Sequence, residues 1–309
     1  MVKEAGRAPG GVALSVKKRM TPYLFLTPFF IITCAFFIYP FINAVILAFY
    51  QTNGPKSRIF VGFENFKFIL SDAIFHKALA NTAIYAFFSV FLQLPLSLGL
   101  ALLLNSRKDK MKGFFRLLLF SPNLVGQVFV GVMFSVLFVP RYGLFNRFLH
   151  NLIGWGLENE WLSNPSLVMP AIILTSLWMY VGFNMIYFLA GLQAVDQELV
   201  EAARIDGANS WQVFWNVTLP ALKPVATFVV VMSTIGSFQL FELPYNLLKN
   251  NGQGFGPQNS GMTIVGYLYD NAFNSGDLGM GAAIGWILAL IIFMISLVQI
   301  HLSGTLRKD

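Results

Sequence analysis

Hydroxyl, amide and aromatic side chains gather in two apolar stretches of the chain, around residues 167–192 and 225–242. The candidates are Ser176, Tyr180, Phe183, Asn184, Ser233, Ser237, Gln239 and Glu242. Such groups can line a water-filled path and exchange hydrogen bonds with a neutral polyhydroxylated solute. The alternative is that they serve helix packing, as Ser and Tyr in apolar helices often do, and that Glu242 simply lies in an open vestibule.

No arrangement of residues suited to catalysis accompanies these groups. His76, His150 and His301 are dispersed at loop or terminal positions, where a lone histidine is usually a surface residue. The one cysteine, Cys34, lies in an apolar run, so no disulfide framework or cysteine metal site is available. The sequence also lacks a G-x-x-x-x-G-K-[ST] phosphate-binding loop. We therefore expect a non-enzymatic chain that binds no cofactor or metal itself.

The stretches that carry the polar candidates are long enough to cross a membrane. Of the 309 residues, 56% are hydrophobic and 11% are charged, which is outside the range of soluble globular proteins. A helix needs about 20 apolar residues to span a bilayer. Six stretches qualify, at about 23–49, 82–104, 117–139, 167–192, 225–241 and 280–302, and the fifth has a possible end beyond Pro244. We expect an all-α integral membrane protein with six transmembrane helices, built as one domain over residues 1–309.

The predicted spans contain no Asp, Glu, Lys or Arg. One such charge at the membrane centre costs about 3 kcal/mol, whereas each Leu contributes only about 0.5 kcal/mol. A proton-coupled carrier usually accepts that cost to obtain a relay of titratable groups. The charge-free spans therefore argue against a secondary, ion-coupled solute carrier.

The basic residues indicate how the spans are oriented. Of the 21 Lys and Arg residues, 14 fall in the N-terminal tail (1–21), after the second and fourth spans, and at the C-terminus, while 7 fall in the segments 51–81, 140–166 and 242–279. The positive-inside rule places both termini in the cytoplasm and those three segments outside. Because this bias accounts for the net charge of +7, we expect no nucleic-acid partner.

One cytoplasmic segment, residues 196–223, differs in composition from the spans around it. Asp196 is suited to the N-cap of a helix that Gly207 ends, and Ser210 to the N-cap of a second helix that Pro220 ends. The second helix would present one aromatic face, formed by Trp211, Phe214 and Trp215. By residue chemistry alone, this hairpin either lies in the lipid interface or docks in a groove of a partner protein.

The segment resembles the EAA loop in the membrane subunits of binding-protein-dependent ABC importers. The family pattern is Glu-Ala-Ala, a Gly four residues after the second Ala, and a later Ile-x-Leu-Pro, and here only the Ile differs, replaced by Val217. By this resemblance, the residues that couple the chain to an ATPase are Glu201, Ala202, Ala203, Asp206, Gly207, Leu219 and Pro220. In that family the loop fits a cleft on an ATPase subunit. The resemblance thus implies two cytoplasmic ABC ATPase subunits, which carry ATP and magnesium.

The resemblance covers nearly the whole chain and points to the carbohydrate-uptake branch, which contains the maltose and glycerol-3-phosphate permeases. It rests on segments such as ALANTAIYAFFSVFLQLPLSLGLALLLN, KGFFRLLLFSPNLV, YGLFNRFL, FLAGLQAVDQELVEAA and TIVGYLYDNAF. The usual Gly-Gly-Pro of the last outward loop appears only as Gly-Phe-Gly-Pro at residues 254–257. The sugar-lining positions of the maltose-type subunit correspond to Ser176, Met179, Tyr180, Phe183, Ser233, Gly236, Ser237 and Leu240.

The resemblance implies a permease subunit of an ATP-driven importer in the bacterial or archaeal cytoplasmic (inner) membrane. Such a chain pairs with a second permease subunit, homologous or identical, and receives a sugar or oligosaccharide from an extracytoplasmic solute-binding protein. The expected mechanism is alternating access, driven through the EAA loop. Two rivals stay open: an ion-coupled carrier, and a membrane scaffold or receptor that uses the same hairpin without transport.

Overall fold

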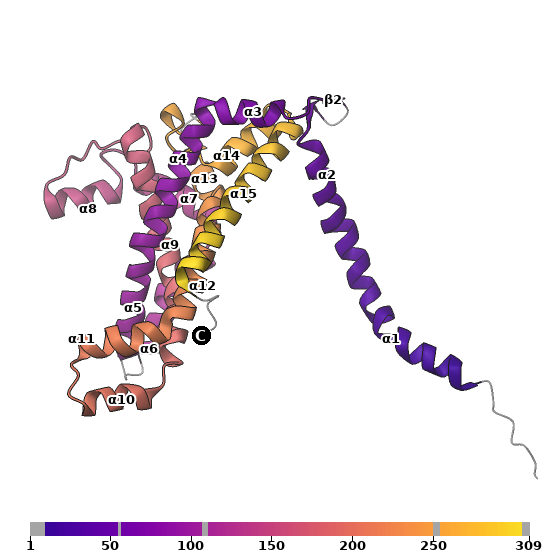
Figure 1. Cartoon of the computed structure of the whole chain (residues 1–309). Helices are drawn as coiled ribbons and strands as arrows, with labels where there is room; N and C mark the ends of the chain where they lie inside the picture. The colour runs from indigo at the N-terminus through magenta and orange to yellow at the C-terminus, as the bar shows by residue number, and fades with distance from the viewer. Residues whose placement is uncertain (1–9, 55–56, 107–110, 250–253, 305–309) are drawn as a thin grey trace, which may run out of the picture.

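The computed structural model describes residues 10–54, 57–106, 111–249 and 254–304 (Figure 1). Within these residues the chain is mostly helical, with one short antiparallel pair of strands, β1 (Tyr50–Asn53) and β2 (Ser57–Phe60). Five of the described helices are long and apolar enough to cross a membrane, and a bent pair of helices supplies a sixth. The predicted class, an all-α membrane protein with six spans, is confirmed.

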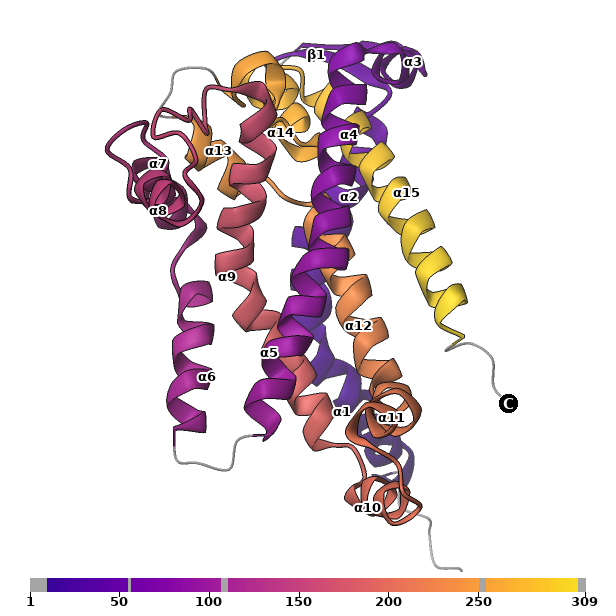
Figure 2. The ribbon, with the colours of Figure 1, turned by 90° about the vertical axis from the view of Figure 1, so that its left-hand side faces the viewer.

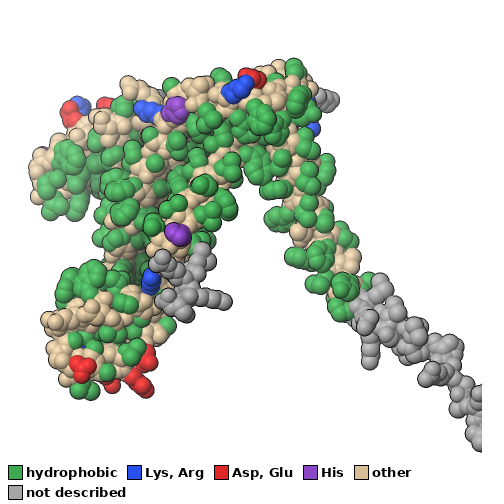
Figure 3. All heavy atoms as spheres, viewed as in Figure 1, with side chains coloured by type: hydrophobic (Ala, Val, Ile, Leu, Met, Phe, Trp, Pro, Cys, Tyr) green, Lys and Arg blue, Asp and Glu red, His purple; other side chains and the backbone are tan. Residues whose placement is uncertain are grey.

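The molecule has two distinct ends. One carries β1 and β2, and we call it the strand end; the other carries the segment 196–223, and we call it the EAA end (Figures 1 and 2). Charged side chains gather toward the two ends, while the surface between them is hydrophobic (Figure 3). This distribution suits a chain whose middle lies in lipid. Several basic residues used to predict the orientation, at 1–9, 107–110 and 305–309, lie outside the described residues, so the orientation stays a prediction.

The first span stands apart from the others. It is formed by α1 (Gly10–Thr33) and α2 (Tyr39–Leu47), which a π-helical turn joins. The apolar part starts at Pro22, close to the prediction, but the helix already begins within the predicted tail (1–21). Figure 1 shows that this helix meets the remaining spans only at the strand end. Although Phe41 of α2 packs against the Trp286 ring of the sixth span, 0% of the apolar window of this first span is buried within the chain.

The fourth and sixth spans agree with the prediction, whereas the second begins nine residues before the predicted residue 82; all three begin at the strand end. They are α4 (Ala73–Phe88) continued by α5 (Leu94–Ser106), α9 (Pro165–Gln193), and α15 (Leu278–Ser303). Each begins with a side-chain N-cap: Asp72, Asn164 and Asp277 accept hydrogen bonds from backbone N–H groups in the first turn. These caps satisfy amide groups that a helix leaves unpaired at its start.

The third span is not the straight helix that the sequence predicted over 117–139. It consists of α6 (Lys112–Phe120) and α7 (Gln127–Leu137), whose axes meet at 94°. Pro122 lies in the connecting 3-10 turn and Gly126 has an extended backbone, so the helical hydrogen bonds stop there. Figure 2 shows α6 running beside α9, and α7 turned aside toward the strand end.

The fifth span begins well before the predicted residue 225. Its first part, α11 (Ser210–Val213), passes through a π-helical turn at Phe214–Thr218 into α12 (Leu219–Phe238), so that one helix extends over all three. The prediction that Pro220 ends a separate helix is therefore wrong. A proline lacks the N–H and clashes with the carbonyl four residues earlier in a regular α-helix. The wider π-helical turn just before Pro220 accommodates it.

The fifth span ends at Phe238 rather than beyond Pro244, and the three segments predicted as outward loops contain further helices. These are α3 (Glu64–Ser71), α8 (Leu144–Ile153), α13 (Glu242–Lys249) and α14 (Ile264–Tyr269). α13 packs against α7 so closely that a Cβ on Gly131 would lie 2.8 Å from Asn246. This close approach fixes α13 against α7 at the strand end.

Candidate functional site

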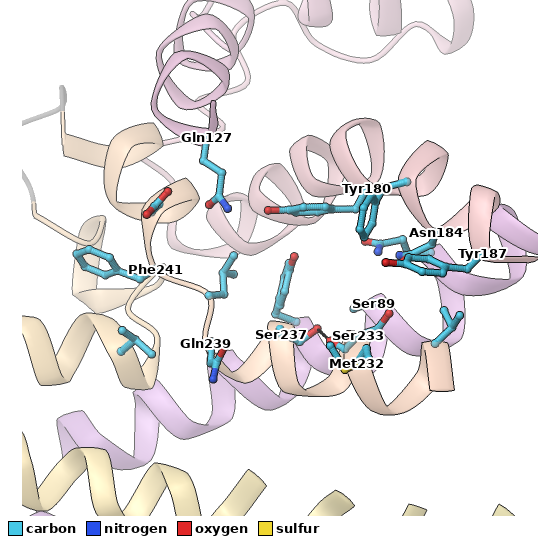
Figure 4. Close-up of a pocket in the computed structure, with 18 of the residues that line it drawn as sticks. Ser89, Gln127, Tyr180, Asn184, Tyr187, Met232, Ser233, Ser237, Gln239 and Phe241 are labelled. Atoms are coloured by element: carbon cyan, nitrogen blue, oxygen red, sulfur yellow. Dashed lines mark hydrogen bonds between the residues drawn. The ribbon is translucent and has the colours of Figure 1, made fainter. Parts of the chain in front are cut away.

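A cavity of about 560 Å³ lies among α4, α9 and α12 (Figure 4). Its wall consists of hydroxyl, amide, aromatic and aliphatic groups with one carboxylate, and no Lys, Arg or His is among the described residues that form it. The lining residues are Tyr85, Ser89, Gln93, Gln127, Tyr180, Phe183, Asn184, Tyr187, Phe228, Val229, Met232, Ser233, Gly236, Ser237, Gln239, Leu240, Phe241, Glu242 and Val265. This mixture can bind a neutral solute through hydrogen bonds and ring contacts.

Seven of the eight residues predicted for the substrate path meet in this cavity. They are Tyr180, Phe183, Asn184, Ser233, Ser237, Gln239 and Glu242. Gly236 and Leu240, which correspond to lining positions of the maltose-type subunit, also line it, whereas Met179 lies in a hydrophobic cluster outside it. Their contact with substrate stays a prediction, but the structure brings them to one place.

Ser176 is the exception among the predicted path residues. It is only 2% exposed and does not line the cavity. Its hydroxyl donates a hydrogen bond to the carbonyl of Ile173 at 2.8 Å, the usual arrangement for a serine inside an apolar helix. It also contacts the hydroxyl of Tyr85, so it can act on the cavity only through that residue.

Helical spacing explains why the remaining residues share a wall. On α9, Tyr180, Phe183, Asn184 and Tyr187 recur at intervals of three and four residues, which places them on one face. On α12, the Ser237 hydroxyl donates to the Ser233 carbonyl at 2.7 Å (Figure 4). The Ser237 proton is thereby occupied, while its lone pairs are left to accept a hydrogen bond from a solute hydroxyl.

The sequence analysis missed the contribution of the second span. Tyr85, Ser89 and Gln93 recur every four residues and line the cavity from the π-helical turn at Ser89–Gln93 and the end of α4. The side-chain oxygen of Gln93 is buried and has no hydrogen-bond partner within the described chain. The signal was available as polar residues at i, i+4 and i+8 in YAFFSVFLQ.

The break in the third span adds another lining residue. Gln127 is the first residue of α7, and the 94° bend brings it to the cavity. In Figure 4, Gln127 and Phe241 lie at one end of the cavity and Tyr187 lies at the other. Because α9 runs from the strand end to the EAA end, the end with Gln127 is nearer the strand end. The exposed Glu242 belongs to this same end.

At the EAA end, the predicted caps Asp196 and Gly207 of the first helix are confirmed, and the predicted N-cap of the second helix is wrong by one residue. α10 (Gln197–Ile205) starts at Asp196, whose carboxylate accepts from the Glu198 N–H at 2.9 Å. Gly207, with φ +86°, follows its last turn in the left-handed conformation that glycine favours. The second N-cap is Asn209 rather than Ser210, because Asn209 and Gln212 form a reciprocal capping box.

The EAA end presents its predicted coupling residues on an open surface. Glu201, Ala202, Asp206, Gly207 and Pro220 are exposed, while Ala203 and Leu219 are half-buried. Large apolar side chains are exposed beside them: Leu199, Ile205, Trp211 and Trp215. The Trp211 and Trp215 rings lie 5.6 Å apart on the predicted aromatic face. Exposed apolar side chains among charged ones are typical of a protein-binding surface.

Comparison with known proteins gives the family. A family model described as "Binding-protein-dependent transport system inner membrane component" matches residues 8–308. The chain belongs to this family. It is a multi-pass inner-membrane permease subunit of a binding-protein-dependent ABC importer, as the EAA resemblance predicted.

Relatives and solved structures agree with this assignment. The chain is 39% identical over 309 residues to the arabinooligosaccharides transport system permease protein AraP of Bacillus subtilis (strain 168), covering 100% of this chain and 96% of AraP. It is 32% identical to the lactose transport system permease protein LacF of Rhizobium radiobacter, over 90% of this chain and 92% of LacF. A chain from a bacterial ABC transporter involved in alginate import has the same fold, with a TM-score of 0.81 at 24% identity over 96% of this chain and 99% of that chain.

Proposed function

We propose that this chain forms, together with a second permease subunit, the path by which a neutral oligosaccharide crosses the membrane. The observation that supports this most directly is the cavity, where hydroxyl, amide and aromatic groups meet without a basic side chain among the described lining residues. The names of AraP and LacF support a carbohydrate substrate. A neutral sugar needs hydrogen-bond partners and ring contacts rather than a counter-ion.

The first span supports a second permease subunit. α1 and α2 stand away from the other spans, and 0% of their apolar window is buried within this chain (Figure 1). In lipid, isolated helices associate through close packing with other helices. A partner permease would occupy the space beside this helix and supply the other half of the translocation path.

The EAA end supports ATPase partners in the cytoplasm. The EAA end projects an exposed bend at Gly207 and several exposed apolar side chains: Leu199, Ile205, Trp211 and Trp215. Such a surface can fit into a groove on a partner protein. We assign ATP and magnesium to two such partners and no catalytic step to this chain. The two termini are then cytoplasmic, and the solute-binding protein docks at the strand end. Closure of the ATP-loaded ATPases would move the EAA loop. This movement would change whether the cavity opens to the outside of the membrane or to the cytoplasm.

Two experiments test this proposal. The tagged chain, purified in mild detergent from its host, should bring with it an ATPase that carries a phosphate-binding loop and a second permease, identified by mass spectrometry. The complex in vesicles should then take up labelled arabino-oligosaccharide or lactose only with ATP and binding protein, and uptake should persist when the proton gradient is collapsed. A strict requirement for the gradient would favour the ion-coupled carrier. An intact complex without uptake of any sugar would favour the scaffold.

A further inference from the structure

Four aromatic rings at the strand end form a continuous set of contacts. The centroids of Phe241 and Tyr269 are 4.9 Å apart, and those of Tyr269 and Phe273 are 5.2 Å apart. Tyr245 lies against the first two, at 5.2 Å from Phe241 and 5.4 Å from Tyr269. We call Phe241, Tyr245, Tyr269 and Phe273 the aromatic track.

The aromatic track leads from the cavity to the surface. Phe241 is a lining residue of the cavity and lies at the same end as Gln127 (Figure 4). Tyr245 and Tyr269 are half-buried, and Phe273 is 65% exposed. Phe273, which is separated from the cavity by the other rings, is thus the exposed member of the track.

The outer half of the track lies outside the hydrophobic core, whereas Phe241 and Tyr245 pack against that core through the buried ring of Phe255. On the same helical segment, Tyr267 is 3% exposed and belongs to the core cluster, and Ala272 is 5% exposed. Tyr269 and Phe273, spaced four residues apart, occupy the other face. A ring that is 65% exposed gains little from burial at its own position, so the core does not account for a Phe at residue 273.

The chemistry of the track fits the faces of sugar rings. A saccharide ring carries hydroxyl groups at its edge and C–H groups on its faces. The negative face of an aromatic ring attracts such C–H groups, and each contact is weak. Polar groups for the hydroxyl edge lie along the same segments: Glu242 next to Phe241, and Asp270 and Asn274 next to Tyr269 and Phe273. Weak, repeated contacts suit a transported ligand, which must bind and also leave.

We propose that the aromatic track is a stacking path that guides successive rings of an oligosaccharide from the strand end into the cavity. This inference rests on the proposed function, because it takes the cavity to be the route of a saccharide. Phe273 makes the first contact, Tyr269 the next, and Phe241 delivers the ring to the hydrogen-bonding groups of the cavity. Tyr245 holds the middle of the track in place. Longer oligosaccharides contact more rings at once than a single sugar does.

The test uses the complete transporter in vesicles with labelled arabinose and arabino-oligosaccharides of increasing length. Phe273→Leu and Tyr269→Leu should each raise KM for uptake by about two- to tenfold for the longer oligosaccharides, the effect of losing one aromatic contact. The effect on arabinose should be smaller, and the maximal rate and basal ATP hydrolysis should change little. Tyr269→Phe, which keeps the ring, should retain a KM close to that of the unaltered protein.

A matched control is available on the second span. Phe91 is 67% exposed and also contacts another ring, that of Phe87 at 4.7 Å, but it does not line the cavity. Phe91→Leu should leave KM unchanged for every length. If Phe273→Leu raises KM equally for all lengths, or lowers only the yield of the second permease in the purified complex, the track is not a path for saccharides. If the unaltered transporter takes up no saccharide, the proposed function fails as well.

Discussion

The hydroxyl of Tyr267 donates a hydrogen bond to Oδ2 of Asp72, 195 residues away in the sequence. The other oxygen of the same carboxylate, Oδ1, accepts from the Ile74 N–H at 3.0 Å. One side chain therefore caps the start of α4 and fastens α14 to it. Burial, and then the contact with Asp72, raise the pKa of Tyr267 above the usual tyrosine range, so that the hydroxyl keeps its proton as a donor.

We expect Tyr267→Phe to lower the free energy of unfolding by about 1–2 kcal/mol, because it removes a hydrogen bond to a charged group. The pKa of Tyr267 is higher in the folded protein than in the unfolded chain, where a tyrosine has a pKa of about 10. The hydrogen bond therefore contributes its full stabilisation below about pH 10, and this contribution is lost as the pH rises from there through the pKa of the folded protein. Thermal unfolding in detergent should thus show a gap between the two proteins at pH 7 that narrows above pH 10. A gap that is absent at pH 7 would contradict a stabilising role for the contact.

Replacing Gly207 by Val should uncouple ATP hydrolysis from uptake while the protein still inserts and assembles. A β-branched residue in the left-handed conformation costs about 1–2 kcal/mol, so the bend after α10 should change. A Cβ at Gly207 would meet nothing within 4 Å, so the strain is confined to the bend. Uptake and hydrolysis by the assembled complex are the measurements.

Gly154 is the matched control for Gly207. Gly154 has a φ of +70°, close to the +86° of Gly207, and a Cβ at Gly154 would also meet nothing within 4 Å. Gly154 ends α8, which lies away from the EAA end. Gly154→Val should bring the same local strain and leave coupling intact. Equal losses of uptake in both variants would mean that strain, and not docking at the EAA end, explains the effect of Gly207→Val.

In the cavity, Phe183→Leu and Ser233→Ala should change KM or the preference among sugars more than they change basal ATP hydrolysis, because both residues line the cavity wall. Each substitution removes one ring or hydroxyl contact, an effect of about threefold to tenfold on KM. Thr175→Val is the control: Thr175 is buried on the same α9, its hydroxyl bonds the Ala171 carbonyl at 2.8 Å, and it does not line the cavity. If KM and the preference among sugars are unchanged in Phe183→Leu and Ser233→Ala as well as in Thr175→Val, then Phe183 and Ser233 do not contact the transported solute.

The crossing of α6 and α9 depends on Gly182. A Cβ at this position would lie 1.7 Å from the backbone oxygen of Leu119, so Gly182→Ala must push the two helices apart. Overpacking of this kind costs about 1–3 kcal/mol. Gly99→Ala on α5 is the comparison, since its Cβ would meet nothing within 4 Å and alanine is the better helix former. If Gly182→Ala unfolds at no lower temperature than Gly99→Ala, the helices approach each other less closely than the structure indicates.

The sequence predicts well what depends on apolar length and local capping. The fourth and sixth spans begin and end within two residues of their predicted limits, and the second ends within two residues of its predicted limit but starts nine residues before the predicted 82. Asp196 caps α10 and Gly207 follows it, since an N-cap acid and a C-terminal glycine act through bonds within a few residues.

The sequence does not reveal changes of helix direction or of hydrogen-bond pattern inside an apolar run. The 94° break between α6 and α7 falls at SPNLVGQ (121–127), whose proline and glycine are local signals of a break but do not give the angle between the two helices. Pro220 is a helix terminator by its local chemistry, and only the π-helical turn before it permits the helix to continue. The same limit hid Gln127, whose place in the cavity depends on the break.

The continuity of α11 and α12 has a mechanical consequence. Helical hydrogen bonding is continuous from Ser210 at the EAA end, through the π-helical turn, to Ser233 in the cavity wall. A displacement of α11 is therefore transmitted along the same helical segment to the residues that line the cavity. Free energy released at the membrane surface can thus reach a bound solute through one continuous element, without a relay of side-chain rearrangements along the way.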